Sequence, residues 1–187
     1  LTTAGKKVGG LRAASGTLGQ GSSDKVRTAL LGIVFKSAGL PELYHIARFV
    51  LWMKRQGIYD QFQTEAEGAG KDWQSELYNL FISKLILSAL LKADPGLASD
   101  KQEVRNLLRA EYKRVDDVTN DQMVRAISDA LSDGDEFPLT LIVLDEVQQY
   151  IGSDGTRAYQ VQEAVETCSK HFEGRLLFVG TGQSALS

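Results

Sequence analysis

The strongest constraint on the fold is the apolar run Leu139–Leu144, which ends in two carboxylates, Asp145 and Glu146. Thr140 is the one polar residue in the run, and β-branched side chains are frequent in it. A strand that is apolar throughout is typical of a parallel sheet with both faces covered. Because open α/β sheets bind ligands beyond the carboxyl ends of their strands, the run predicts a site at Asp145 and Glu146.

A second strand is predicted over 175–181, where another apolar run ends in Thr181, with Gln183 two positions further on. Between the two strands, apolar residues at helical spacing predict a helix over about 156–172. The apolar stripe of this helix consists of Val161, Ala164, Val165, Cys168 and Phe172. Strand, helix and strand in this order predict a right-handed βαβ unit with parallel strands.

An apolar strand followed by Asp-Glu resembles the Walker B motif of ATP-hydrolysing P-loop proteins. The resemblance implies that Asp145 holds Mg²⁺ through water and that Glu146 orients or deprotonates the attacking water. It also implies that Thr181 contacts the γ-phosphate or the attacking water, with Gln183 as the second candidate. The alternative interpretation is that the carboxylates only favour the start of a helix and that Thr181 lies in a plain turn.

The sequence lacks the loop G-x-x-x-x-G-K-[ST], whose backbone N–H groups and Lys wrap the phosphates of a nucleotide. Gly70 and Lys71 are followed by Asp72, and Glu65 occupies the place of the first glycine. We therefore expect half of an ATPase site, in a chain that is a piece of a longer protein and is inactive toward ATP by itself.

Longer segments resemble the large P-loop proteins of BREX bacteriophage-defence systems (the BrxC/PglY type). The resemblance covers most of the chain and is most specific in Leu141–Gly152 and Arg175–Leu186, with further similarity in Gly10–Leu18, Gly32–Pro41 and Val161–Glu166. It implies an AAA+/ASCE-like core, ATP and Mg²⁺ as cofactors of the whole protein, and other components of the defence system as partners.

The resemblance also implies a strand order. The strand over 140–145 is expected in the middle of a parallel sheet, between 11–18 on one side and 175–181 on the other. The candidate residues at the strand ends then lie at the same end of the sheet. The strand over 175–181 becomes an edge, and an exposed edge favours self-association.

The predicted fold is α/β: a partial P-loop core of three parallel strands, formed by 1–24 and 137–187, in one domain with an all-helical insertion at 25–136. Within the insertion, Thr119–Gln122 predicts a capping box, and 73–91 is predicted to be one buried helix. The insertion is a candidate interaction module. The alternative function is therefore a non-catalytic protein-interaction or scaffold domain with a degenerate P-loop core.

Composition narrows the classes of function. The 187 residues carry a net charge of −3 and give no overall basic character that would indicate a contact with DNA. No apolar run reaches the ~18–20 residues of a membrane span. The single Cys168 cannot form an internal disulfide and is expected in the core, and two distant histidines without a Cys/His cluster argue against zinc. A cytoplasmic location is expected.

Overall fold

The computed structural model describes residues 10–19, 25–134 and 136–182. The chain divides into two compact units, one formed by Leu1–Leu43 with Asp116–Ser187 and the other by Tyr44–Val115. The first unit contains a sheet and the predicted site, and we call it the sheet unit. The described residues of the second unit form helices and turns, and we call it the helical unit.

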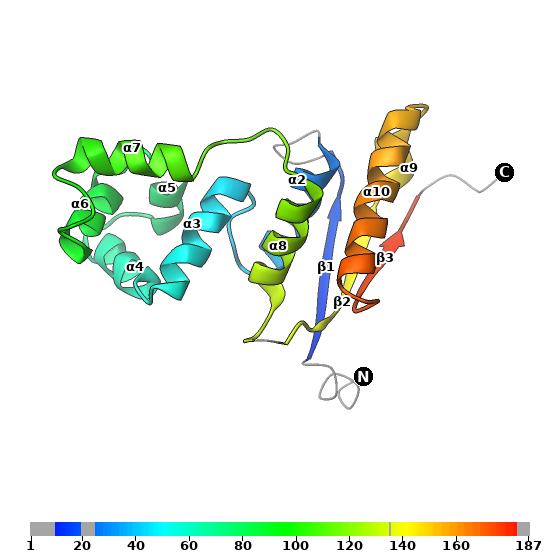
Figure 1. Cartoon of the computed structure of the whole chain (residues 1–187), viewed down its shortest axis with the longest axis horizontal. Coiled ribbons are helices and arrows are strands. Elements are labelled where there is room, and N and C mark those ends of the chain that lie inside the picture. Colours follow the sequence, from blue (N-terminus) through cyan, green and yellow to red (C-terminus); the bar gives the residue numbers. More distant parts are fainter. Residues whose placement is uncertain (1–9, 20–24, 135, 183–187) are drawn as a thin grey trace. The chain divides into compact units, whose positions relative to one another are not determined.

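The sheet unit is built on three parallel strands, β1 (Leu11–Thr17), β2 (Leu139–Asp145) and β3 (Leu176–Gly180), in the order β1-β2-β3 (Figure 1). The predicted α/β class, strand order and strand directions are confirmed. In the register of the sheet, Thr17 lies opposite Asp145, and Leu144 lies opposite Gly180. The carboxyl ends of the strands therefore meet at one edge.

Helices α2 (Val26–Ser37), α8 (Asn120–Leu131), α9 (Val147–Ile151) and α10 (Gly155–His171) complete the sheet unit. Helix α2 packs on β1 and α8. Helix α10 packs on β3, α2 and α8. Helix α8 begins with the predicted capping box, in which the Thr119 side chain accepts from the Gln122 backbone and the Gln122 side chain accepts from the Thr119 backbone. The buried side chains of the sheet unit include Leu31, Val34, Phe35, Ile127, Ile142 and Leu176.

A close approach between β1 and α2 explains the glycine inside the strand. A Cβ atom on Gly16 would lie 2.7 Å from Cγ1 of Ile33, so a larger residue would force the Ile33 side chain or its helix to shift. Ala14, which shares this face of β1 with Gly16, is buried. The helices therefore cover the face of the sheet that carries Ala14 and Gly16.

The helical unit consists of α3 (Tyr44–Arg55), α4 (Tyr59–Gly68), α5 (Trp73–Tyr78), α6 (Lys84–Ala93) and α7 (Lys101–Glu111). It is smaller than the predicted insertion over 25–136, because α2 and α8 pack on the sheet unit.

The prediction of one helix over 73–91 is wrong, since α5 and α6 are separate helices. Ser83 breaks the segment because it is the N-cap of α6, where its Oγ accepts from the backbone N–H of Ile86 at 3.1 Å.

One thiol in the sheet unit and one imidazole in the helical unit are buried, and burial shifts the pKa of each group. Cys168 is buried, which confirms its predicted place in the core, and burial raises the pKa of its thiol to about 12. His45 is also buried, and its ring stacks on Phe81 at 5.9 Å between centroids. Burial, which is the larger cause, and the charge of Arg114, which is the smaller one, lower the pKa of His45 from 6.5 to about 4.

Among the helices of the described residues, none combines the length and apolar character that crossing a membrane requires.

We expect the stability of the helical unit to fall with acid. The unfolded chain protonates His45 near its ordinary pKa of 6.5, whereas the folded chain binds this proton only near pH 4. The stability that the neutral ring contributes is complete above pH 6.5 and is lost as the pH falls from 6.5 to 4. Urea unfolding at pH 7 and pH 5 measures this loss. In His45→Gln the loss between these pH values should be smaller, and equal losses in both proteins would contradict the assignment.

Candidate functional site

The ends of β2 and β3 bring Asp145 and Thr181 together. The Thr181 hydroxyl donates a hydrogen bond to Oδ1 of Asp145, and the same oxygen accepts from the backbone N–H of Glu146 at 3.0 Å. Both side chains are exposed to solvent. The edge of the sheet therefore presents a carboxylate and a hydroxyl whose relative orientation is fixed by a direct bond.

Backbone hydrogen bonds hold Thr181 in this position from two sides. Its N–H donates to the carbonyl of Leu144 at 2.9 Å, and its carbonyl accepts from the N–H of Val147 at 3.1 Å. The chain after β3 thus stays bonded to the segment that contains Asp145 and Glu146. The placement of Thr181 depends on the main chain as well as on its side chain.

Glu146 has an unusual backbone conformation. Its φ of 54° and ψ of 32° lie in the left-handed region, which costs a residue other than glycine about 1–3 kcal/mol and is frequent at functional sites. The carbonyl of Glu146 accepts from the backbone N–H groups of Gln149 at 3.0 Å and Tyr150 at 3.2 Å. The chain therefore changes direction at Glu146 and starts α9.

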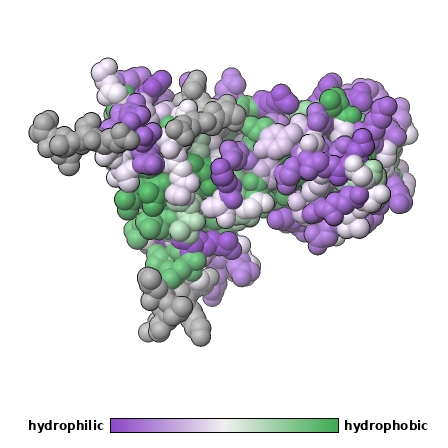
Figure 2. Space-filling model, turned by 180° about the vertical axis from the view of Figure 1, so that it is seen from behind, coloured by the Kyte–Doolittle hydropathy of each residue, from purple (hydrophilic) through white to green (hydrophobic). Residues whose placement is uncertain are grey.

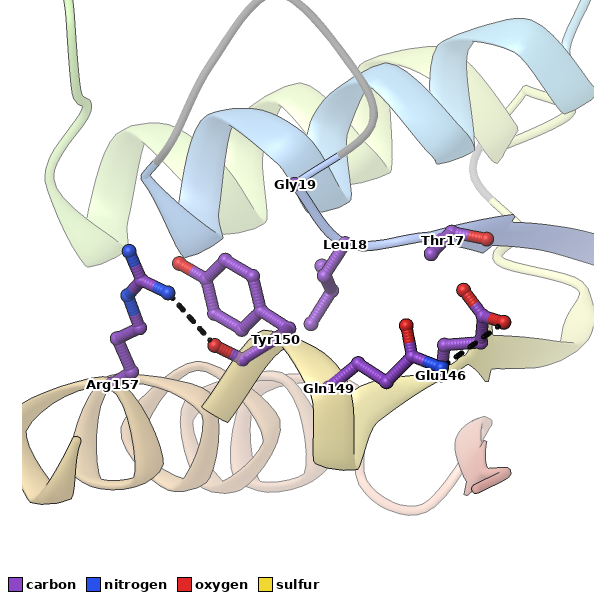
Figure 3. Close-up of a pocket in the computed structure, with 7 residues that line it drawn as sticks. All are labelled: Thr17, Leu18, Gly19, Glu146, Gln149, Tyr150 and Arg157. Atoms are coloured by element: carbon purple, nitrogen blue, oxygen red, sulfur yellow. Dashed lines mark hydrogen bonds between the residues drawn. The ribbon is translucent and has the colours of Figure 1, made fainter. Parts of the chain in front are cut away.

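The side chain of Glu146 lines a pocket of about 330 Å³ at the carboxyl ends of β1 and β2 (Figure 3). The pocket is lined by Thr17, Leu18, Gly19, Glu146, Gln149, Tyr150 and Arg157. Oε1 of Glu146 accepts a long hydrogen bond from Nε2 of Gln149, at 3.4 Å. The three candidate residues are thus divided around β2, with Glu146 on the β1 side and Thr181 on the β3 side of Asp145.

Arg157 lies at the other end of this pocket from Glu146 (Figure 3). Its Nη1 donates to the carbonyl of Tyr150 at 3.0 Å, and its guanidinium stands 5.1 Å from the centroid of the Tyr150 ring. Its Nε lies 3.7 Å from Oδ2 of Asp154. These contacts make Arg157 part of the pocket wall. Its guanidinium already interacts with Tyr150 of α9 and with Asp154, the N-cap of α10.

Sequence reasoning missed several residues of this pocket. Thr17 ends β1 as Asp145 ends β2, so the rule that located the site at the carboxyl edge could have found it too. Tyr150 follows Glu146 by one helical turn, and this spacing would also have placed it nearby. Gln183, the second candidate for the sensor position, lies outside the described residues.

The exposed oxygens fit the requirements of Mg²⁺. In nucleotide sites this ion keeps several waters and binds through one or two carboxylates together with phosphates of the substrate. Asp145 and Thr181 supply a carboxylate and a hydroxyl at an open edge, which suits contact through water. Within the parts of the chain that the structure describes, no group of three or more His, Cys, Asp or Glu could hold a metal ion.

Comparison with protein-family models, with curated proteins and with solved structures found no match to this chain.

Proposed function

We propose that this chain supplies the magnesium-binding and water-activating part of an ATPase centre in a larger protein. We call that larger protein the full-length protein, and its other segments would bind the phosphates. The observation that carries the proposal is the hydrogen bond between Thr181 and Asp145 across the ends of adjacent parallel strands. The resemblance to the P-loop proteins of BREX phage-defence systems, with its Walker B pattern and sensor strand, supports the same function.

In this proposal each residue has a separate task. Asp145 would hold Mg²⁺ through water, and Thr181 fixes the rotation of the Asp145 carboxylate by donating to Oδ1. When bound, the ion neutralises negative charge that develops on the phosphates. Glu146 accepts a proton from the attacking water. Because Glu146 lines the pocket on the β1 side, its side chain must rotate toward Asp145 when the nucleotide binds.

Replacement of Asp145 by Ala tests the proposal in the full-length protein. We expect the affinity for Mg²⁺ in the presence of ATP to fall by roughly 10–100-fold, the usual effect of losing an outer-shell ligand. Calorimetric titration with Mg·ATP, compared with ATP in EDTA, separates the metal-dependent part of binding. The chain 1–187 by itself should show no micromolar affinity for Mg·ATP. Equal affinity in wild type and Asp145→Ala would remove Asp145 from the site.

A binding or scaffold domain is the second candidate function. The helical unit exposes several large apolar side chains, namely Tyr78, Ile82, Leu97, Leu107 and Val115, which would suit a protein partner such as another defence component. This function does not need Asp145. Full biological activity of the Asp145→Ala protein would therefore favour the scaffold over the ATPase.

A further inference from the structure

The hydroxyl of Thr181 has no proton left for a ligand. A threonine hydroxyl carries one O–H donor, and that of Thr181 donates to Oδ1 of Asp145. The backbone N–H of Thr181 is also in use, because it donates to the carbonyl of Leu144 at 2.9 Å. The oxygens of a phosphate are strong hydrogen-bond acceptors. With these bonds in place, neither the hydroxyl nor the N–H of Thr181 can donate to the terminal phosphate of a nucleotide.

The side chain of Gln148 stands at the same strand end and carries two N–H donors. Gln148 is the second residue of α9. The first residue, Val147, donates its backbone N–H to the carbonyl of Thr181 at 3.1 Å. This bond joins the start of α9 to the end of β3. The main chain therefore holds Gln148 close to Thr181.

A close fit against Gly182 fixes the place of the Gln148 amide. A Cβ atom on Gly182 would lie 2.8 Å from Cδ and 3.1 Å from Cγ of Gln148. Real Cβ atoms essentially never approach another heavy atom to less than 3.0 Å, so the amide occupies the space that a larger residue at 182 would need. The glycine after Thr181 thus leaves room for the side chain of Gln148.

The two consecutive glutamines of α9 lie on opposite sides of β2. Gln149 lines the pocket, where its Nε2 donates to Oε1 of Glu146 at 3.4 Å (Figure 3). Gln148 lies against Gly182 on the β3 side. It is exposed, and within the described part of the chain its amide has no hydrogen-bond partner. Its two donors are therefore available to a ligand on the side of Thr181.

The surroundings of this amide suit a polar ligand. The strands run upward in Figure 1, and Figure 2, which is turned about the vertical axis, shows mostly hydrophilic side chains at the upper end of the sheet unit. Hydrophobic side chains gather lower down, over the strands. The exposed apolar residues Leu141 and Leu177 lie inside β2 and β3, whereas Gln148 follows the end of β2. Gln148 therefore stands at the polar edge of the sheet.

We propose that Gln148 is a catalytic residue of the ATPase centre, whose amide donates a hydrogen bond to the terminal phosphate during hydrolysis. It supplies the donor that Thr181 has committed to Asp145. The inference rests on the proposed function and names the residue that contacts the substrate on the β3 side of Asp145. Glu146 keeps its separate task, since it accepts the proton of the attacking water whereas Gln148 donates to the phosphate.

Replacement of Gln148 by Ala in the full-length protein is expected to lower kcat for ATP by roughly 10²–10³-fold, the usual effect of removing one donor to developing negative charge. The Kd for Mg·ATP should stay close to that of wild type, because the bond strengthens in the transition state. The matched control is Gln162→Ala, at an exposed glutamine of α10 whose Nε2 donates to Glu166 at 2.7 Å. This control should keep the wild-type kcat, and circular dichroism checks that both variants are folded.

Gly182→Ala tests the same contact without changing Gln148. The added methyl group displaces the Gln148 amide, because the far end of a flexible side chain yields more easily than the main chain. We therefore expect kcat to fall in Gly182→Ala as well. In the double variant the space is already free, so its kcat should be no lower than that of Gln148→Ala. Losses that multiply in the double variant would show that the two positions act independently, and they overturn the proposed contact.

Three further outcomes separate this proposal from the proposed function. If Asp145→Ala weakens Mg·ATP binding while Gln148→Ala turns over as fast as Gln162→Ala, the role of Gln148 alone fails. If Gln183→Ala lowers kcat and Gln148→Ala does not, the donor is Gln183 and the proposal is overturned. A full-length protein without ATPase activity overturns the proposed function, and the role of Gln148 with it.

Discussion

Replacement of Glu146 by Gln in the full-length protein is expected to slow ATP hydrolysis by about 10²–10⁴-fold, the usual contribution of a general base. The amide keeps the shape of the side chain and its long contact with Gln149, but it cannot accept a proton. Nucleotide binding should remain unchanged, because the proposal assigns Mg²⁺ to Asp145 and gives Glu146 a task only in hydrolysis. Steady-state ATPase rates and Mg·ATP titration of the same variant measure both effects.

The matched control is Glu166→Gln, which removes an exposed carboxylate of α10 that accepts from Gln162 at 2.7 Å. This variant should keep the wild-type rate and affinity. If Glu146→Gln hydrolyses ATP as fast as the control, Glu146 is not the base. Weaker nucleotide binding with an unchanged turnover rate would instead assign Glu146 to the binding of the ligand.

Replacement of Phe35 by Ala should give the largest loss of stability, about 3–5 kcal/mol, since it removes a large buried ring and leaves a cavity. Phe35 is fully buried on α2, the helix that packs on both β1 and α8. Its loss therefore weakens the packing of α2 in the core. Urea unfolding followed by circular dichroism gives the free energy of unfolding for the variant and for wild type.

Tyr159→Ala is the control for this experiment, because an exposed side chain of α10 should change stability by no more than ~0.5 kcal/mol. A loss below ~1 kcal/mol in Phe35→Ala would show that α2 does not depend on this ring. Such a result would count against the complete burial of the Phe35 ring.

The sheet could be predicted because its strands carry strong local signals. The apolar run of β2 is too long and too rich in β-branched residues for a loop, and the polar residues that follow β2 and β3 marked the edge of the sheet where Asp145 and Thr181 meet. The strand order came from the resemblance to P-loop proteins, and the register confirms it.

Other features could not be predicted, because the sequence carries no strong signal for them. The division of the segment 25–136 depends on what covers the apolar faces of α2 and α8, and periodicity shows only that such faces exist. The left-handed conformation of Glu146 is rare for glutamate, so its sequence gives no signal for it. The break between α5 and α6 depends on the single cap at Ser83.

The apolar character of β2 also predicted a cover on both faces of the sheet. The structure supplies a cover on the face with Ile142 and leaves Leu141 exposed on the other. The sequence of β2 therefore predicts cover on both faces of the sheet, and the described residues cover one of them.

The hydrogen bonds of Thr181 connect the end of β3 to β2 and to α9. Its N–H and carbonyl join the end of β2 to the start of α9, and its hydroxyl holds Asp145. Thr181 is therefore bonded to the same segment that places Gln149 and Tyr150 in the wall of the pocket, and the two sides of β2 share one set of backbone hydrogen bonds.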